Sequence, residues 1–244
     1  MKKFTFFFIA IIFVFAFYYF LNNLTFNSKR SFTIFGADIS NQYKGRLNWE
    51  KLGDSNSFII LRAVRCVDTN KIKGQHSYTC VIDTNFENNW RDLEKNKLIR
   101  GAYHRYSPGL SPKSQFEVYK NHVHLGNKDL PPILDIQAIQ NNKIEINLAI
   151  EWLKMANAYY NTIPIMYLDY SSYLAIKKNS FIDEINRNYF EKIYLMVKST
   201  EQPAIDRPFL WQYVQDTAIK GFQEKVDLIR YTGDSISFKN ILIR

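Results

Sequence analysis

The chain has 244 residues, 46% of them hydrophobic and 16% aromatic, and its nine glycines and seven prolines are too few for a disordered chain. The formal net charge of +9 is not gathered on a basic helix face or interleaved with aromatic residues, which argues against a nucleic-acid partner. A solvated lysine-rich surface accounts for most of this charge, although a basic domain also suits an anionic cell wall or membrane surface.

The N-terminal segment is predicted to lie outside the folded domain. Lys2 and Lys3 precede an apolar run from Phe4 to Leu21, whose 18 residues are close to the minimum that crosses a bilayer. No small residues of a cleavage site follow, so residues 1–21 are predicted to be an uncleaved transmembrane anchor, with the lysines inside and the rest of the chain exported. A signal peptide cut near Asn23 to Ser28 is the alternative, and it exports the domain as well.

Beyond a polar tether over residues 22–31, residues 32–244 are predicted to form one exported domain. The only two cysteines, Cys66 and Cys80, lie in one predicted loop from Arg65 to Ile82. Cysteine pairs in exported proteins tend to oxidise, so a disulfide is expected, with two free thiols as the alternative. A Cα separation beyond about 7 Å would exclude the bridge.

Apolar, strand-like segments alternate with amphipathic segments along this domain. The predicted helices are Leu47–Leu52, Asp83–Asn96 with Asp83 as its cap, Ser111–Leu125 with Pro112 at its first position, Asn142–Tyr160 and Ser171–Lys177. The alternation implies a parallel sheet, and predicts an α/β fold, a modified TIM-like β/α barrel of eight strands with few helices in the last third. The predicted strands are Phe32–Ile39, Ser57–Val64, Ile99–Tyr106, Ile133–Gln137, Ile163–Leu168, Ile193–Val197, Phe209–Tyr213 and Val226–Tyr231.

The chemistry of the domain is expected at the end of the fourth predicted strand. Side chains two apart on a strand point to one face, so Asp135 and Gln137 are predicted to share a site. A charge in such a buried strand is costly unless it is paired or used. Two carboxylates here would be typical of enzymes that cleave glycosidic bonds, but residue 137 is a glutamine.

Other polar residues are predicted at the same edge of the barrel. Asp38, His104 and Asp227 also lie at or near strand ends, where barrel enzymes carry their sites. No spacing of histidines or cysteines is that of a metal site, since His122 and His124 would face different sides of their helix. We therefore expect a site without a metal or a cofactor.

Short pieces of the chain match a known family in order and spacing. They are Phe35–Ser40, Asn48–Trp49, Phe58–Ala63, Asp83 with Phe86 and Asn89, Arg100–His104, Leu130–Ile136, Pro164–Tyr167, Trp211–Tyr213 and Val226–Leu228. Together they resemble the glycoside hydrolase family 25 lysozymes, the Chalaropsis-type N-acetylmuramidases. The resemblance implies a modified β/α barrel with an acidic groove, which hydrolyses the β-1,4 bond between N-acetylmuramic acid and N-acetylglucosamine in peptidoglycan.

The resemblance maps the family's acidic site onto Asp38, Asp135 and Asp227, which are all present. The family's fourth strand ends in Asp-x-Glu, whose Glu is its presumed general acid, and this chain has Gln137 there. A carboxamide has no proton to give near neutral pH, although it can hold a sugar by hydrogen bonds. The next acid along the chain, Glu145, is expected on a helix surface.

Further charges and aromatic rings are expected in the groove. Arg65 stands where the family usually has Glu, and Arg105 where it usually has an aromatic residue, so both are expected to add positive charge. His104 is expected to be a hydrogen-bonded residue of the barrel, with a direct contact to a sugar as the alternative. Aromatic side chains near strand ends are expected to stack on sugar rings where they do not pack in the core: Tyr103, Tyr167, Trp211 and Tyr213.

Two functions follow from the resemblance. The first is a muramidase, reduced or lost in activity because of Gln137, that trims peptidoglycan from the outer side of a bacterial cytoplasmic membrane. A single-pass N-terminal helix would hold the domain there, on the periplasmic or outer face. The alternative is a pseudoenzyme that binds glycan strands or a partner protein with the same barrel.

Overall fold

The computed structural model describes residues 34–39, 47–69, 77–139, 142–178, 182–219 and 225–244. Within these ranges, no helix is long and apolar enough to span a bilayer. The expected anchor over residues 1–21 and the tether over residues 22–31 lie outside the described residues, so both stay predictions from the sequence.

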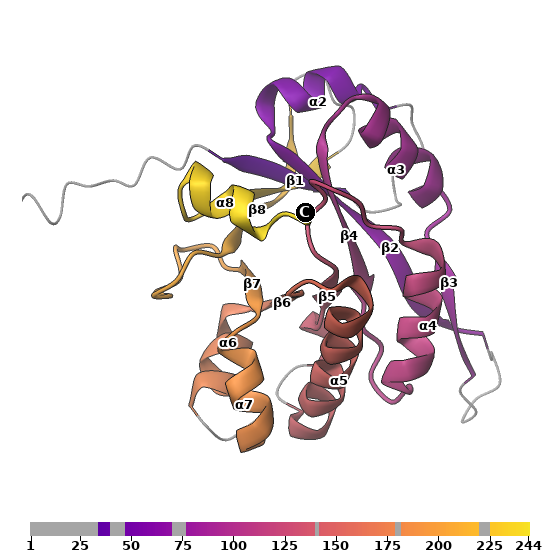
Figure 1. Cartoon of the computed structure of the whole chain (residues 1–244), viewed down its shortest axis with the longest axis vertical. Helices are drawn as coiled ribbons and strands as arrows, with labels where there is room; N and C mark the ends of the chain where they lie inside the picture. Colours follow the sequence, from indigo (N-terminus) through magenta and orange to yellow (C-terminus); the bar gives the residue numbers. More distant parts are fainter. Residues whose placement is uncertain (1–33, 40–46, 70–76, 140–141, 179–181, 220–224) are drawn as a thin grey trace, which may run out of the picture. The chain divides into compact units, whose positions relative to one another are not determined.

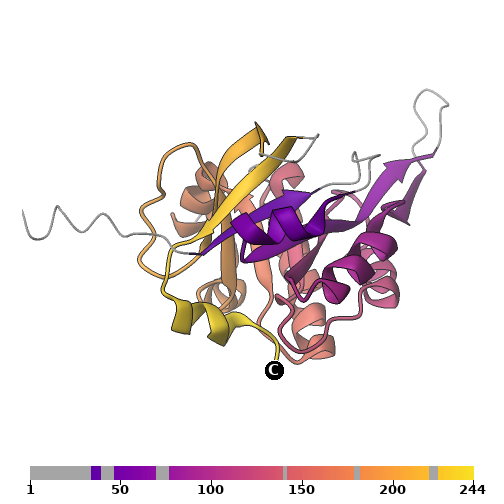
Figure 2. The same cartoon turned by 90° about the horizontal axis from the view of Figure 1, so that it is seen from above.

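One sheet closes into a barrel in the described part of the chain (Figures 1 and 2). Its strands are β1 (Phe35–Ile39), β2 (Phe58–Asp68), β3 (Tyr78–Ile82), β4 (Ile99–Arg105), β5 (Ile133–Asp135), β6 (Ile165–Asp169), β7 (Tyr194–Lys198), β8 (Leu210–Ala218) and β9 (Lys225–Tyr231). Eight of them follow the order β1-β9-β8-β7-β6-β5-β4-β2, and pairing of β1 with β2 closes the ring. The predicted eight-stranded barrel is therefore confirmed.

One ring strand runs against the others. β9 is antiparallel to both of its neighbours, β1 and β8, whereas the other neighbouring strands of the ring pair in parallel. The prediction of a parallel sheet is thus wrong for β9. Only six residues separate Ala218 from Lys225, too few for the crossover helix that a parallel connection needs, so the chain returns as a hairpin.

The segment predicted as a cysteine-bearing loop is instead a pair of strands. β2 continues beyond Val64 to Asp68, and β3 runs back along this extension with Cys66 opposite Cys80. A disulfide joins the two cysteines, whose Cα atoms are 3.8 Å apart. β3 is rich in β-branched residues, which suit a strand, but it is too short for its alternation to stand out in the sequence.

Helices cover the barrel, most of them around its outside and one across an end (Figure 1). They are α2 (Trp49–Ser55), α3 (Phe86–Lys95), α4 (Pro112–His122), α5 (Lys143–Tyr160), α6 (Tyr170–Lys177), α7 (Glu184–Phe190) and α8 (Ser235–Ile241), with a 3₁₀ turn, η1 (Gln137–Ile139). The five predicted helices are present, and Ser111 caps α4 by accepting from the N–H of Ser114. The sequence missed α7 and α8 because each has only two turns, too few to show a 3.6-residue stripe.

α8 closes the end of the barrel at which the parallel strands begin. The ring of Phe238 on this helix lies 5.4 Å from that of Phe58 on β2 and 5.2 Å from that of Tyr231 on β9. Above these rings, alternate strand residues fill the interior, among them Ile60, Ile133, Ile165, Met196 and Ile229. The opposite end, where the parallel strands finish, is left to polar side chains.

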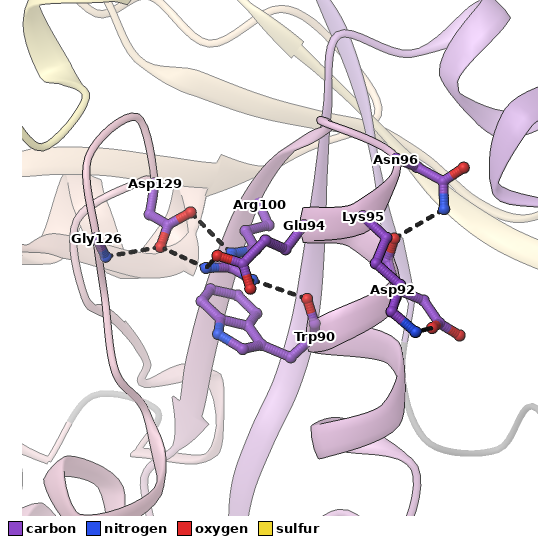
Figure 3. A network of polar contacts seen from close by, with 8 residues as sticks. All are labelled: Trp90, Asp92, Glu94, Lys95, Asn96, Arg100, Gly126 and Asp129. Atoms are coloured by element: carbon purple, nitrogen blue, oxygen red, sulfur yellow. Dashed lines mark hydrogen bonds and ion pairs between the residues drawn. The ribbon is translucent and has the colours of Figure 1, made fainter.

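A buried charge network holds β4 to its surroundings (Figure 3). Arg100 donates from Nε to Asp129 at 2.9 Å and from Nη1 to the carbonyl of Trp90 at 2.9 Å. Its guanidinium also lies 4.2 Å from the centre of the Trp90 ring and 3.3 Å from the carboxylate of Glu94. Asp129 in turn accepts from the backbone N–H of Gly126 at 2.8 Å. The network connects α3 and the loop after α4 to the start of β4. It therefore lies at the end of the barrel opposite to the carboxyl ends of the parallel strands.

Candidate active site

A polar pocket of about 230 Å³ opens where the parallel strands finish. Strand register brings its residues together: Asp38 lies opposite Asp227 across β1 and β9, and Asp135 lies between Arg105 and Tyr167 on neighbouring strands. All four positions expected to be catalytic line this one pocket. The lining residues are Asp38, Arg62, Tyr103, Arg105, Asp135, Gln137, Tyr167, Lys198, Gln215, Asp216, Lys225 and Asp227.

Gln137 lines the pocket, but it does not lie on a strand as predicted. β5 ends at Asp135, and Gln137 opens the 3₁₀ turn instead of continuing the strand. Its backbone N–H donates to Oδ1 of Asp135 at 3.0 Å, while Nε of Arg105 lies 3.8 Å from Oδ2. Burial raises the pKa of Asp135 above its ordinary value, and these two partners limit the rise because they favour the ionised form.

Asp227 is held by donors from the β8–β9 hairpin. Its Oδ1 accepts from the backbone N–H of Asp216 at 2.9 Å, and its Oδ2 accepts from the side-chain amide of Gln212. The amide oxygen of Gln212 in turn accepts from the hydroxyl of Tyr167. Burial raises the pKa of Asp227, and the hydrogen bond from Asp216 opposes the rise. Gln212 was not predicted as a site residue, and its contacts with Tyr167 and Asp227 appear only in the folded barrel.

Four cations line the pocket, and only one of them was expected there. Arg105 is present as predicted, but Arg65 is not: its side chain is 42% exposed and lies 3.5 Å from Asp83, outside the pocket. Arg62 takes its place, held by Asp83 at 2.7 Å. Asp83 is therefore a buried ion-pair partner and not the predicted helix cap, a position taken by Asn85. Phe58, Ile60 and Arg62 alternate along β2, and this alternation could have shown that Arg62 is the arginine that faces inward. The other two cations that line the pocket are Lys198 and Lys225.

Three of the expected aromatic contacts lie in or beside the pocket. Tyr103 and Tyr167 line it, with ring centres 6.4 Å apart in an edge-to-face arrangement. Tyr213 lines a second pocket of about 410 Å³, which shares Lys198 and Gln215 with the first. The two pockets therefore adjoin along the ends of β7 and β8.

His104 and Trp211 line neither pocket, so the structure does not bring these two candidate sugar contacts to the site. His104 follows Tyr103 on β4 and points to the opposite face, where it is fully buried, 2.9 Å from Gln115 and stacked on Trp152. Burial lowers its pKa to about 4. Trp211 is buried and donates its indole N–H to a backbone carbonyl at 2.8 Å.

Glu145 is also not where it was expected. It is buried at the start of α5, where it accepts from the hydroxyl of Tyr106 at 3.2 Å and from the backbone N–H of Gly109 at 2.9 Å. It does not line the pocket, so it offers no replacement acid. Within the described ranges, no group of three His, Cys, Asp or Glu side chains is arranged to hold a metal ion.

The chain matches the family model of glycosyl hydrolases family 25 over residues 37–222. It belongs to glycosyl hydrolase family 25. The family resemblance predicted from the sequence is therefore confirmed. Among curated relatives, this family-25 chain is similar to the uncharacterized protein YegX of Escherichia coli K12, with 28% identity over 144 residues. That match spans 56% of this chain and 48% of YegX, about half the length of the relative.

Solved structures share the fold of this family-25 chain at low sequence identity. A family 25 glycosyl hydrolase from Bacillus anthracis superposes with a TM-score of 0.70 and 19% identity, over 89% of this chain and 97% of that one. A bacterial lysozyme from Streptomyces coelicolor gives a TM-score of 0.66 and 19% identity, over 86% and 96% of the two chains. These likenesses establish the barrel architecture.

The family-25 pocket combines three aspartates with neutral donors and cations. Carboxylates stabilise positive charge that develops on a sugar during bond cleavage, while amides, hydroxyls and guanidinium groups hold sugar oxygens. Gln137, which lines the same pocket, has a side chain that binds but does not titrate. The arrangement is thus suited to binding an oligosaccharide and to stabilising a cationic transition state.

Proposed function

We propose that this protein binds the glycan strands of peptidoglycan and slowly hydrolyses the β-1,4 bond between N-acetylmuramic acid and N-acetylglucosamine. The observation that carries the proposal is that one pocket of a family-25 barrel holds Asp38, Asp135 and Asp227 together. Three acidic side chains at the strand ends of such a barrel are the arrangement expected for glycosidic-bond cleavage.

Hydrolysis is expected to be slow because of residue 137. By resemblance to the family, this position carries the acid that protonates the leaving oxygen, and here it is Gln137. General acid catalysis typically contributes about 10²–10⁴-fold in rate, and a carboxamide supplies none of it. Asp135 is a poor substitute because a backbone N–H and Arg105 both favour its ionised form.

A second function is favoured by the same glutamine. A barrel that keeps the groove and lacks the acid would serve as a glycan-binding or partner-binding protein without cutting. The retained aspartates and the pocket tyrosines favour glycan over an unrelated partner, because they offer the acceptors and rings that sugars contact.

A digest of purified peptidoglycan by the full-length chain tests both functions. Chromatography and mass spectrometry of the soluble products detect muropeptides, and co-sedimentation with insoluble peptidoglycan measures binding. Slow release of muropeptides with N-acetylmuramic acid at the reducing end, abolished in Asp135→Asn, supports the muramidase. Binding without any release after prolonged incubation supports the non-catalytic function, and absence of both results refutes the proposal.

We further propose that the domain works outside the bacterial cytoplasmic membrane, held by residues 1–21. The apolar run after Lys2 and Lys3 supports this placement. The Cys66–Cys80 disulfide supports export independently, since disulfides persist in oxidising compartments and are rare in the cytosol. Peptidoglycan is also found on that side, so substrate and enzyme would share a compartment.

A further inference from the structure

Asp38 differs from the other two aspartates of the pocket in its hydrogen bonds. Its Oδ1 is buried and has no hydrogen-bond partner among the described residues, and the whole residue is only 7% exposed. Asp135 accepts from the N–H of Gln137, and Asp227 accepts from the N–H of Asp216 and from a side-chain amide. Such donors favour an ionised carboxylate, so they oppose the rise that burial causes in the pKa of Asp135 and of Asp227, whereas the buried Oδ1 of Asp38 has no such donor among the described residues.

Strand register places Asp38 against a second carboxylate. Asp38 lies directly opposite Asp227 across the antiparallel pair β1 and β9, a geometry that brings Cβ atoms to about 4.5–5.5 Å. Two carboxylates this close resist being ionised together, and the proton stays on the one whose buried Oδ1 has no donor in the described part of the chain. Asp227, with its donors on both oxygens, takes the charge.

The charged groups that surround Asp38 come from four strands. Burial raises the pKa of Asp38 well above its ordinary value, and the negative charges of Asp227 and Asp135 raise it further. Arg62 from β2 and Arg105 from β4 oppose the rise, but each already faces another carboxylate, at 2.7 Å and 3.8 Å respectively. The phenols of Tyr103 on β4 and Tyr167 on β6 also neighbour it and are neutral. The same pocket is lined by further charged side chains, those of Lys198, Asp216 and Lys225.

We propose that Asp38 holds a proton in this pocket and delivers it to the glycosidic oxygen, the role that Gln137 cannot take. The inference rests on the proposed hydrolysis. As the carboxyl proton of Asp38 passes to the leaving oxygen, the bond from the anomeric carbon to that oxygen breaks and its electron pair stays with the oxygen, giving an alcohol. The anionic Asp135 and Asp227 stabilise the positive charge left on the sugar. Water then adds to the anomeric carbon, and the proton that it releases restores the carboxyl of Asp38.

Rates measured in two backgrounds test this assignment. Reducing-end release from purified peptidoglycan is compared for the full-length native chain, Asp38→Asn, Gln137→Glu and the double variant. If Asp38 is the proton donor, Asp38→Asn lowers the native rate by about 10²-fold or more. In the Gln137→Glu background a second acid is present, so the same change lowers the rate by less than about 10-fold. An equal loss in both backgrounds, or no loss in the native one, overturns the proposal.

The pH dependence of stability tests whether Asp38 is protonated, without any need for hydrolysis. A carboxyl group whose pKa is higher in the folded than in the unfolded protein stabilises the fold while it is protonated. This stabilisation is complete below the unfolded-state pKa of about 3.9 and is lost as pH rises through the folded-state pKa. The native chain is therefore expected to lose urea resistance relative to Asp38→Asn as pH rises from about 4 to 8. A constant difference between the two chains would show that Asp38 carries no proton and would overturn the proposal.

The two measurements also separate this proposal from the proposed function. If none of the four chains releases reducing ends, the muramidase fails, and proton delivery by Asp38 fails with it. If the native chain hydrolyses peptidoglycan and Asp38→Asn matches it, the muramidase stands and the assignment of Asp38 alone is wrong.

Discussion

Replacing Gln137 with Glu is expected to raise hydrolysis of peptidoglycan by the full-length chain. The two side chains have nearly the same size, and the backbone N–H of residue 137 keeps its bond to Asp135 in either case. What the change adds is a titratable proton at the position that, by resemblance to the family, protonates the leaving oxygen. The change also replaces the side-chain amide of Gln137 that hydrogen-bonds Asp135, so it alters the pKa of Asp135 as well as adding an acid.

The size of the gain depends on charges already near residue 137. The adjacent carboxylate of Asp135 raises the pKa of a new glutamic acid by like-charge repulsion, which suits a general acid near neutral pH. Arg105 opposes this, but its side chain is 50% exposed and its charge is screened by solvent. A gain of about 10²-fold is expected, at the lower end of the usual range for general acid catalysis. It corresponds to a barrier lower by about 2.7 kcal/mol.

Reducing-end release from purified cell wall, measured between about pH 4 and 8, is the assay. The variant is expected to gain rate at acidic and neutral pH and to lose it as pH rises through the pKa of the new acid. Gln215→Glu is the matched control, because Gln215 lines the same pocket near its exposed rim, and this change should give no gain. Robust hydrolysis by the native chain, unchanged or reduced in Gln137→Glu, would refute this account of residue 137.

Three further predictions concern stability, oxidation and export. Arg100→Met is expected to lower the free energy of unfolding by about 3 kcal/mol, because it leaves the buried carboxylate of Asp129 without its ion pair. Cys66 and Cys80 are expected to resist alkylation without reductant, and reducing them should cost up to about 3 kcal/mol of stability in the chain-entropy model. N-terminal sequencing of the membrane fraction is expected to find residues 1–21 still attached to the domain.

Each of these predictions has a control or a contrary outcome. Arg91→Met changes an exposed arginine on α3 and should alter the free energy of unfolding by less than about 0.5 kcal/mol. If Arg100→Met is equally mild in urea unfolding, the buried network contributes little. Two alkylatable thiols in the intact protein would refute the disulfide as a feature of the protein in solution. A mature start between Leu21 and Arg30 would refute the anchor and favour a cleaved signal peptide.

The sequence by itself determined the barrel and the chemistry at its strand ends. Eight apolar segments separated by amphipathic ones predict strands and helices, because each pattern is a local property of the chain. The placement of Asp38 and Asp135 at the carboxyl ends of strands followed from the same pattern. Asp227 lies near the start of its strand and joins them in the pocket because β9 is antiparallel, which the pattern did not show. The start of one helix was also predictable from the local sequence, since Ser111 caps the helix that begins at Pro112.

Only the tertiary structure decided which side chains face the pocket and what surrounds them. Arg62 faces inward and Arg65 does not, while Tyr103 lines the pocket and its neighbour His104 is buried on the other face. The facing of a side chain depends on strand register, which is set by pairing between segments far apart in the chain. The donors that hold Asp227 and the burial that raises the pKa of Asp38 likewise come from other strands. Proton affinities in this pocket are therefore properties of the assembled barrel, which no local pattern encodes.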